Sequence, residues 1–171
     1  ADLDGRAHGL AARARQLMID RCFVPERGFY ADTTSTHNAD AALLMMINLG
    51  FLRRGHAHAE SHLRALMSEL AVAPPLLHRY RHHDGIGETH SAFTVCGFWC
   101  VEALARLGHV DEAEAGLERL VAYANHVGLF SEDIDPKTGA QWGNFPQTYS
   151  HVGLINAAFA VSPLPLEVDD P

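Results

Sequence analysis

The sequence has few cysteines and lacks the signals of a secreted protein. Only three of its 171 residues are cysteine, which is too few for a disulfide framework, and the odd number indicates reduced thiols. No Asn-x-Ser/Thr sequence occurs, and no secretory signal opens the chain. We therefore expect a cytoplasmic protein that folds as a single domain over residues 1–171.

Long hydrophobic runs and an excess of basic charge are also missing. The longest apolar stretch, residues 39–52, is interrupted by Asp40, Asn48 and Gly50, and it is shorter than the ~20 residues of a membrane-spanning helix. Thirteen basic residues stand against 21 acidic ones, for a net charge of −8. Nucleic acids and acidic membranes attract clustered Lys and Arg, so we predict neither as a partner.

Helical periodicity is present along most of the chain. Apolar residues recur on one face in three segments, and three other segments are apolar nearly all round. The two kinds alternate: 7–18, 58–71 and 111–125 are amphipathic, whereas 40–49, 91–107 and 147–161 are apolar. This alternation predicts an all-α fold, an α/α toroid of about six helices in three hairpins, with the apolar helices in an inner layer.

The connections between these helices differ in length. Links from inner to outer helices are short, but those from outer to inner helices, 21–39, 72–90 and 126–146, are long. Long loops are usually functional, and antiparallel hairpins place all three at one end, beside the free N–H groups of the inner helices. We expect a polar or anionic site there. Three hairpins cannot close a ring, so missing sequence or a partner chain must cover the inner helices.

Residues 128–158 hold the richest mixture of chemical groups. The carboxylates of Glu132 and Asp133 are followed by Trp142 and Tyr149, with amide side chains between them. Acids in loops are mostly solvated, so a plain polar loop is one interpretation. The other is a sugar site, because a sugar stacks its apolar face on an aromatic ring and hydrogen-bonds through its hydroxyls.

Four stretches in order resemble glycoside hydrolase family 15, the glucoamylase, glucodextranase and trehalase family. They are NADAALLMMINLGFL (38–52), HRYRHHDG (78–85), SAFTVCGFWCVEALARLG (91–108) and SEDIDPKTGAQWGNFPQTYSHVGLINAA (131–158). The resemblance covers roughly residues 5–161. It implies that the chain is the C-terminal half of an (α/α)6 barrel.

The resemblance also implies a mechanism and a catalytic residue. Inverting glycosidases use two carboxylic acids ~6.5–9.5 Å apart, one to protonate the leaving oxygen and one to activate water. The family's general base lies in a Ser-Glu-x motif, which matches Ser131-Glu132-Asp133 and assigns the role to Glu132, with Asp133 as the alternative. The general acid lies in a Trp-Glu motif that this chain does not contain. We expect the isolated chain to be inactive.

Further positions match the family's substrate-binding residues. Arg79, in the pair with Tyr80, falls on a substrate-binding arginine whose fork can donate two hydrogen bonds to adjacent hydroxyls; a surface arginine stacked on Tyr80 is the alternative. Phe93 and Tyr149 match aromatic platforms, although both could be core aromatics, and Trp142 is a further candidate for substrate binding.

The expected substrate is an α-linked glucoside or oligosaccharide. A glucoamylase-like exo-hydrolase is favoured over a trehalase, because no residue in the sequence can be assigned to binding the second sugar unit. A non-catalytic helical binding or assembly module is an alternative from another class, and so is a lyase or epimerase that uses histidine as its base. The partner expected besides the substrate is the missing half of the toroid, or a second copy of the chain.

Twelve histidines raise the question of a metal site. His58 and His62 stand four residues apart, and His78, His82 and His83 gather near Asp84, spacings that could bind Zn²⁺. No third ligand of fixed spacing completes either set, so we predict solvated histidines, no metal and no cofactor. Cys96 and Cys100 lie on one face of an apolar helix and are predicted to be small core residues.

Overall fold

The computed structural model describes residues 3–83, 85, 87 and 90–162. The described helices are α1 (Leu3–Arg21), the 3-10 helix η1 (Ala41–Leu44), α2 (Met45–Asn48), α3 (Ala59–Leu70), α4 (Thr94–Leu107), α5 (Val110–Val121) and α6 (Thr148–Val161). The strands are β1 (Phe23–Val24), β2 (Phe29–Tyr30), β3 (Ala71–Ala73), β4 (Leu76–Leu77), β5 (Ala92–Phe93), β6 (Asp133–Ile134) and β7 (Gln141–Trp142). Within these ranges no helix combines the length and apolar character that a membrane span requires.

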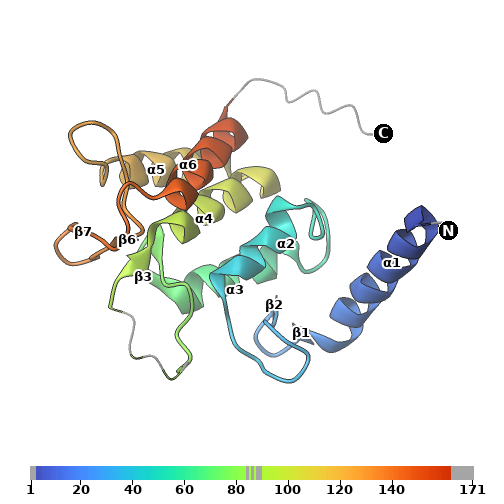
Figure 1. Cartoon of the computed structure of the whole chain (residues 1–171). Coiled ribbons are helices and arrows are strands. Elements are labelled where there is room, and N and C mark those ends of the chain that lie inside the picture. The colour runs from blue at the N-terminus through green and yellow to red at the C-terminus, as the bar shows by residue number, and fades with distance from the viewer. Residues whose placement is uncertain (1–2, 84, 86, 88–89, 163–171) are drawn as a thin grey trace.

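Helix α4 lies at the centre of the packing. It contacts α2 on one side and α6 on the other, and the amphipathic helices α3 and α5 cover it from outside (Figure 1). Gly153 allows the close approach of α6, because a Cβ there would lie 3.0 Å from side-chain atoms of Val95 and Phe98. The inner and outer layers predicted from the alternating helices are therefore confirmed, as part of an α/α toroid.

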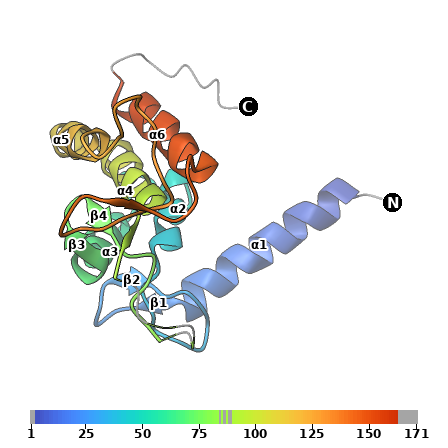
Figure 2. The same cartoon turned by 60° about the vertical axis from the view of Figure 1, so that its left-hand side comes forward.

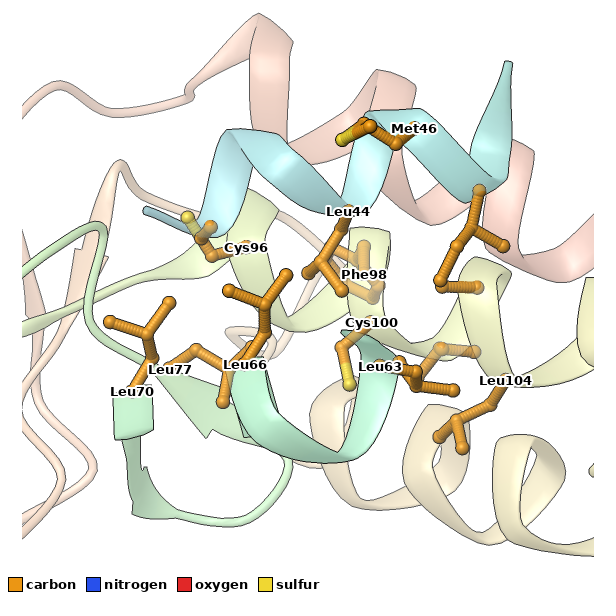
Figure 3. Packing of buried hydrophobic residues seen from close by; sticks show 14 of the residues in the cluster. Leu44, Met46, Leu63, Leu66, Leu70, Leu77, Cys96, Phe98, Cys100 and Leu104 are labelled. Carbon is orange, nitrogen blue, oxygen red and sulfur yellow. The ribbon is translucent and has the colours of Figure 1, made fainter. Parts of the chain in front are cut away.

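The core is formed where the outer helix α3 meets α4. Leu63 and Leu66 of α3 face Cys96 and Cys100 of α4, with Leu44 of η1 above them (Figure 3). Each such aliphatic side chain gains about 1.5–3 kcal/mol from full burial. Burial raises the pKa of both thiols to about 12, so they stay protonated and act as small core residues, as predicted.

The segment predicted as an inner helix at 40–49 is shorter and less regular than expected. It begins with the 3-10 turn η1, because the Asp40 carboxylate accepts a hydrogen bond from the Ala42 amide at 2.7 Å and caps the first turn. It ends as the single α-helical turn α2. Leu49 follows with 82% of its surface exposed, so the prediction of burial on every side is wrong at this residue.

Two other helices present uncovered apolar faces. On α6 the side chains of Val152, Ile155 and Phe159 are about half exposed, although the sequence predicts burial of this helix on most sides. Helix α1 stands away from the rest of the chain, with Leu10 and Leu17 exposed (Figure 2). Exposed apolar faces of this kind are typical of interaction surfaces.

The three long connections meet at one end of the helices, as predicted. Strands β1 and β2 form a hairpin in the first connection, and β3 and β4 form one in the second. Strand β5 at the end of the second connection pairs with β6, and β6 with β7, in the third. A bridge between Asp40 and Tyr80 joins the first connection to the second. Backbone pairing therefore links all three.

His62 contradicts the prediction of solvated histidines. Its side chain is fully buried between three segments. Its Nδ1 accepts a hydrogen bond from the Tyr30 amide at 3.1 Å, and its Nε2 donates to the Leu43 carbonyl at 3.0 Å. Both contacts require the neutral ring with the proton on Nε2. Burial lowers the pKa of His62 from 6.5 to about 4.

We expect this histidine to make stability depend on pH. As the pH falls, the unfolded chain binds the proton first, so the stabilisation is present above pH 6.5 and is lost between pH 6.5 and about 4. The loss amounts to up to about 3 kcal/mol. Urea unfolding at several pH values measures it, with His62→Gln as the control, since glutamine does not titrate. If the free energy of unfolding changed equally with pH in both proteins, His62 would not be the source of the pH dependence.

Candidate active site

The β5-β6-β7 sheet brings the predicted site residues of two loops together. Phe93, Asp133 and Trp142 lie directly opposite one another across its three strands. Next to them, the Thr94 amide donates to the Glu132 carbonyl at 2.9 Å, and the Glu132 amide donates to the Asn144 carbonyl at 2.9 Å. Glu132 is therefore held by its backbone between the start of α4 and the segment that leads from β7 to α6.

The Glu132 carboxylate has a defined environment. Its Oε2 accepts hydrogen bonds from the Asn144 amide N–H at 3.1 Å and from the Asn144 Nδ2 at 2.8 Å. Gly143 approaches so closely that a Cβ there would lie 2.9 Å from Oε2, and its φ of 77° is one that glycine adopts without strain. The side chain is half-buried. Among the described residues no hydrogen-bond partner is found for Oε1.

Asp133, the next residue, faces a different environment. It lines a cavity of about 680 Å³ together with His78, Ser91 and Trp142, whereas Glu132 does not. Burial raises the pKa of Asp133, the nearby Glu132 charge raises it further, and a hydrogen bond with the Ser91 side chain opposes both. The two acids are adjacent in the sequence, but their side chains lie in different places: Asp133 in the cavity, and Glu132 against Asn144.

Asp135 belongs to the turn that follows. Its carboxylate accepts from the Lys137 amide at 2.8 Å and from the Thr138 hydroxyl at 2.9 Å. These two hydrogen bonds lower the pKa of Asp135 and shape the turn between β6 and β7. For this acid the plain interpretation, a polar Asp-Pro turn, holds.

Arg79 is fixed by an acid that sequence reasoning did not select. Its Nη1 forms an ion pair with Asp40 Oδ1, and its carbonyl accepts from the Ala41 amide at 2.8 Å. The side chain as a whole remains 33% exposed, although its Nη1 atom is buried. Tyr80 stacks on His82, with ring centroids 4.5 Å apart. Asp40 could have been noticed as an acid directly before an apolar helix, the position of an N-cap.

The three candidate aromatic platforms differ in exposure. Phe93 is half-buried against the core, whereas Trp142 and Tyr149 are 59% and 66% exposed. Tyr149 is therefore not a core residue. It lies in the first turn of α6, beside Ser150, whose buried hydroxyl donates to the Ser131 carbonyl at 2.8 Å. This bond ties the start of α6 to the segment that carries Glu132.

Three further histidines make structural contacts. His78 is buried, so the prediction of a solvated side chain is wrong for it too, and its Nδ1 hydrogen-bonds to the Ser91 carbonyl at 3.0 Å. His151 bonds through Nδ1 to the Gln147 carbonyl at 2.7 Å and accepts at Nε2 from the Phe130 amide at 3.4 Å. His58 stacks on Phe23. Asp84, the acid next to the histidine cluster at 78–83, lies outside the described residues. Across 3–83, 85, 87 and 90–162 no three His, Cys, Asp or Glu side chains are grouped to hold a metal.

The sequence matches one family of known proteins. The family described as Glycosyl hydrolases family 15 matches residues 6–159. A trehalase of Thermoplasma acidophilum is 37% identical over 141 residues, covering 82% of this chain, and a trehalase of Mycobacterium tuberculosis is 36% identical, covering 81%. The chain spans only 24% and 21% of the lengths of these relatives.

Solved structures agree with the fold. A structure titled as a wild-type glycosidase superposes with a TM-score of 0.79 at 20% identity, covering 94% of this chain and 45% of its own. A variant glycosidase in complex with glucose gives a TM-score of 0.78 at 19% identity and the same coverage. The helical arrangement is thus that of a part of a larger glycosidase domain.

Proposed function

Because the chain belongs to glycosyl hydrolase family 15, we propose that it is the base-bearing part of an inverting α-glycosidase. The observation that carries this proposal is the Glu132 carboxylate, which is half-buried and held by Asn144 through one oxygen, while its other oxygen has no hydrogen bond to any residue that the structure describes. A general base needs an oxygen that is available to accept a proton from water and a fixed orientation. The hydrogen bonds on Oε2 supply the orientation and leave Oε1 for this role.

The reaction would use Glu132 to remove a proton from the attacking water. The water oxygen bonds to the anomeric carbon as the glycosidic C–O bond breaks, and the leaving oxygen takes a proton from the second acid. That acid would come from outside this chain, which contains no Trp-Glu motif. Asp133 is less suited to the base role, because it faces the separate cavity beside Trp142.

The substrate would be held by residues around Glu132. Arg79, whose side chain is 33% exposed, would donate to adjacent sugar hydroxyls, and its ion pair with Asp40 keeps it in place. Tyr149 offers an exposed ring for stacking, and Tyr80 would contribute half-buried apolar surface. Trp142 and Phe93 lie opposite Asp133 across the sheet, so they would contact a part of the substrate that extends to the cavity on that side.

We place trehalose first among the substrates. The sequence alone favours a glucoamylase-like enzyme, but relatives 36–39% identical over 141 residues are trehalases. This degree of identity to trehalases supports an α,α-linked disaccharide over a long oligosaccharide. Maltooligosaccharides are the second candidate.

The partner that completes the site would be the rest of the toroid. The uncovered apolar faces of α6 and α1 need helices against them, and the superposed glycosidase is about twice as long as the matched part. A second copy of this chain is the other occupant to test, although it would bring a second base and no acid.

Trehalose hydrolysis followed by proton NMR tests the proposed function. The complete enzyme, meaning this chain joined to the segment with the general acid, should release one β-glucose and one α-glucose in the first turnovers. Inversion changes the anomeric configuration of only one of the two sugars. Maltotriose serves as the comparison substrate. Release of α-glucose alone, or failure to cleave any α-glucoside, would contradict the proposal.

A further inference from the structure

We propose that Asn144 is a positioning residue that aims the Glu132 carboxylate, an inference that rests on the base role proposed above. Three hydrogen bonds join the two residues: the Glu132 amide donates to the Asn144 carbonyl, and the Asn144 amide and Nδ2 both donate to Glu132 Oε2. The pair is thus linked by backbone and side chain together.

The two donors act on a single oxygen. Because both the amide and Nδ2 of Asn144 reach Oε2, the carboxylate cannot rotate about its last bond without losing both hydrogen bonds. Oε1 is therefore presented in one direction. Hydrogen bonds to a charged acceptor are stronger than neutral ones, so this restraint is effective on a half-exposed side chain.

Gly143 also lies against the Glu132 side chain. A Cβ at this position would lie 2.9 Å from Oε2 and 3.0 Å from the Glu132 Cβ, and the φ of 77° disfavours any other residue. The absence of a side chain at position 143 therefore leaves the space that the Glu132 carboxylate occupies beside Asn144. Gly143 also lines the cavity on the Asp133 side, so it separates the two acids.

Orientation of the base has a large kinetic effect. Misplacement of a reacting group by about 1 Å can lower a rate about 100-fold, because the water is no longer held in line with the anomeric carbon. Loss of the Asn144 side-chain bond leaves only the backbone donor on Oε2. We therefore expect Asn144→Ala to lower kcat by about 10- to 100-fold, with KM little changed.

The test compares variants of the complete enzyme with trehalose as substrate. Asn144→Ala removes the side-chain donor, and Asn144→Asp places an oxygen where the donor was; both should lower kcat. Thr138→Ala is the matched control, because it removes a hydrogen bond in the same hairpin, to Asp135, without touching Glu132. It should leave kcat within about twofold. Circular dichroism and unfolding temperature check that all variants are folded.

A double-variant experiment separates positioning from structural support. Once Glu132→Gln has removed the base, Asn144→Ala should cause no further fall in kcat, because there is no base to aim. A further fall equal to that in the wild-type background would overturn the inference. So would a normal kcat for Asn144→Ala in an enzyme that Glu132→Gln inactivates. If Glu132→Gln itself keeps normal kcat, the proposed function fails instead.

Discussion

Replacing Glu132 by glutamine in the complete enzyme is expected to lower kcat by about 10²- to 10⁴-fold while KM changes little. Glutamine keeps the shape of the side chain and can accept the Asn144 hydrogen bonds through its carbonyl oxygen, but it cannot take a proton from water. Steady-state kinetics with trehalose measure the effect, and calorimetric titration shows whether the sugar still binds.

Asp133→Asn is the matched control for this prediction. The two acids are adjacent in the sequence, yet only Glu132 is held by Asn144, and Asp133 lies in the cavity beside Ser91. We expect Asp133→Asn to lower kcat far less. If Asp133→Asn is the more damaging change, or Glu132→Gln keeps near-normal kcat, the assignment of the base is wrong.

Azide gives an independent check on which face the water attacks. In Glu132→Ala a small anion can enter the space of the missing carboxylate and bond to the anomeric carbon as the glycosidic bond breaks, while the leaving sugar takes its proton from the general acid. Inversion requires the product to be a β-glycosyl azide. Recovery of the α-anomer would place the base elsewhere.

The 171-residue chain by itself is expected to hydrolyse neither trehalose nor maltooligosaccharides measurably. A positioned general acid contributes about 10²- to 10⁴-fold to the rate, and substrate-orienting groups outside the chain would be missing too. A glucose-release assay at high protein concentration measures the residual activity. Robust turnover by this chain would contradict its assignment as the base-bearing part.

The same preparation should associate or precipitate. Val152, Ile155 and Phe159 on α6 and the apolar residues of α1 are exposed to water in the single chain, and such faces drive association. Sedimentation velocity distinguishes the outcomes, and addition of the segment that completes the toroid should give a defined complex. A stable monomer at all concentrations would show that these faces need no partner.

The sequence by itself determined the helices and their layers. Periodicity is a local property, so an amphipathic segment such as 111–125 and an apolar one such as 91–107 are distinguishable without a structure. The lengths of the connections follow from the positions of these helical segments. The long connections predicted a site at the end of the helices where all three meet. The resemblance of Ser131-Glu132-Asp133 to the family's motif gave Glu132 as a candidate, because such a motif spans only a few residues.

Only the tertiary structure decided what surrounds each side chain. Glu132 and Asp133 are neighbours in the chain, but pairing with residues 141–144 turns one toward Asn144 and the other into the cavity. His62 and Asp40 acquire their roles from Tyr30 and Arg79, which lie 32 and 39 positions away. Long-range contacts of this kind depend on how the long connections fold back on the helices, and no local pattern in the sequence encodes that.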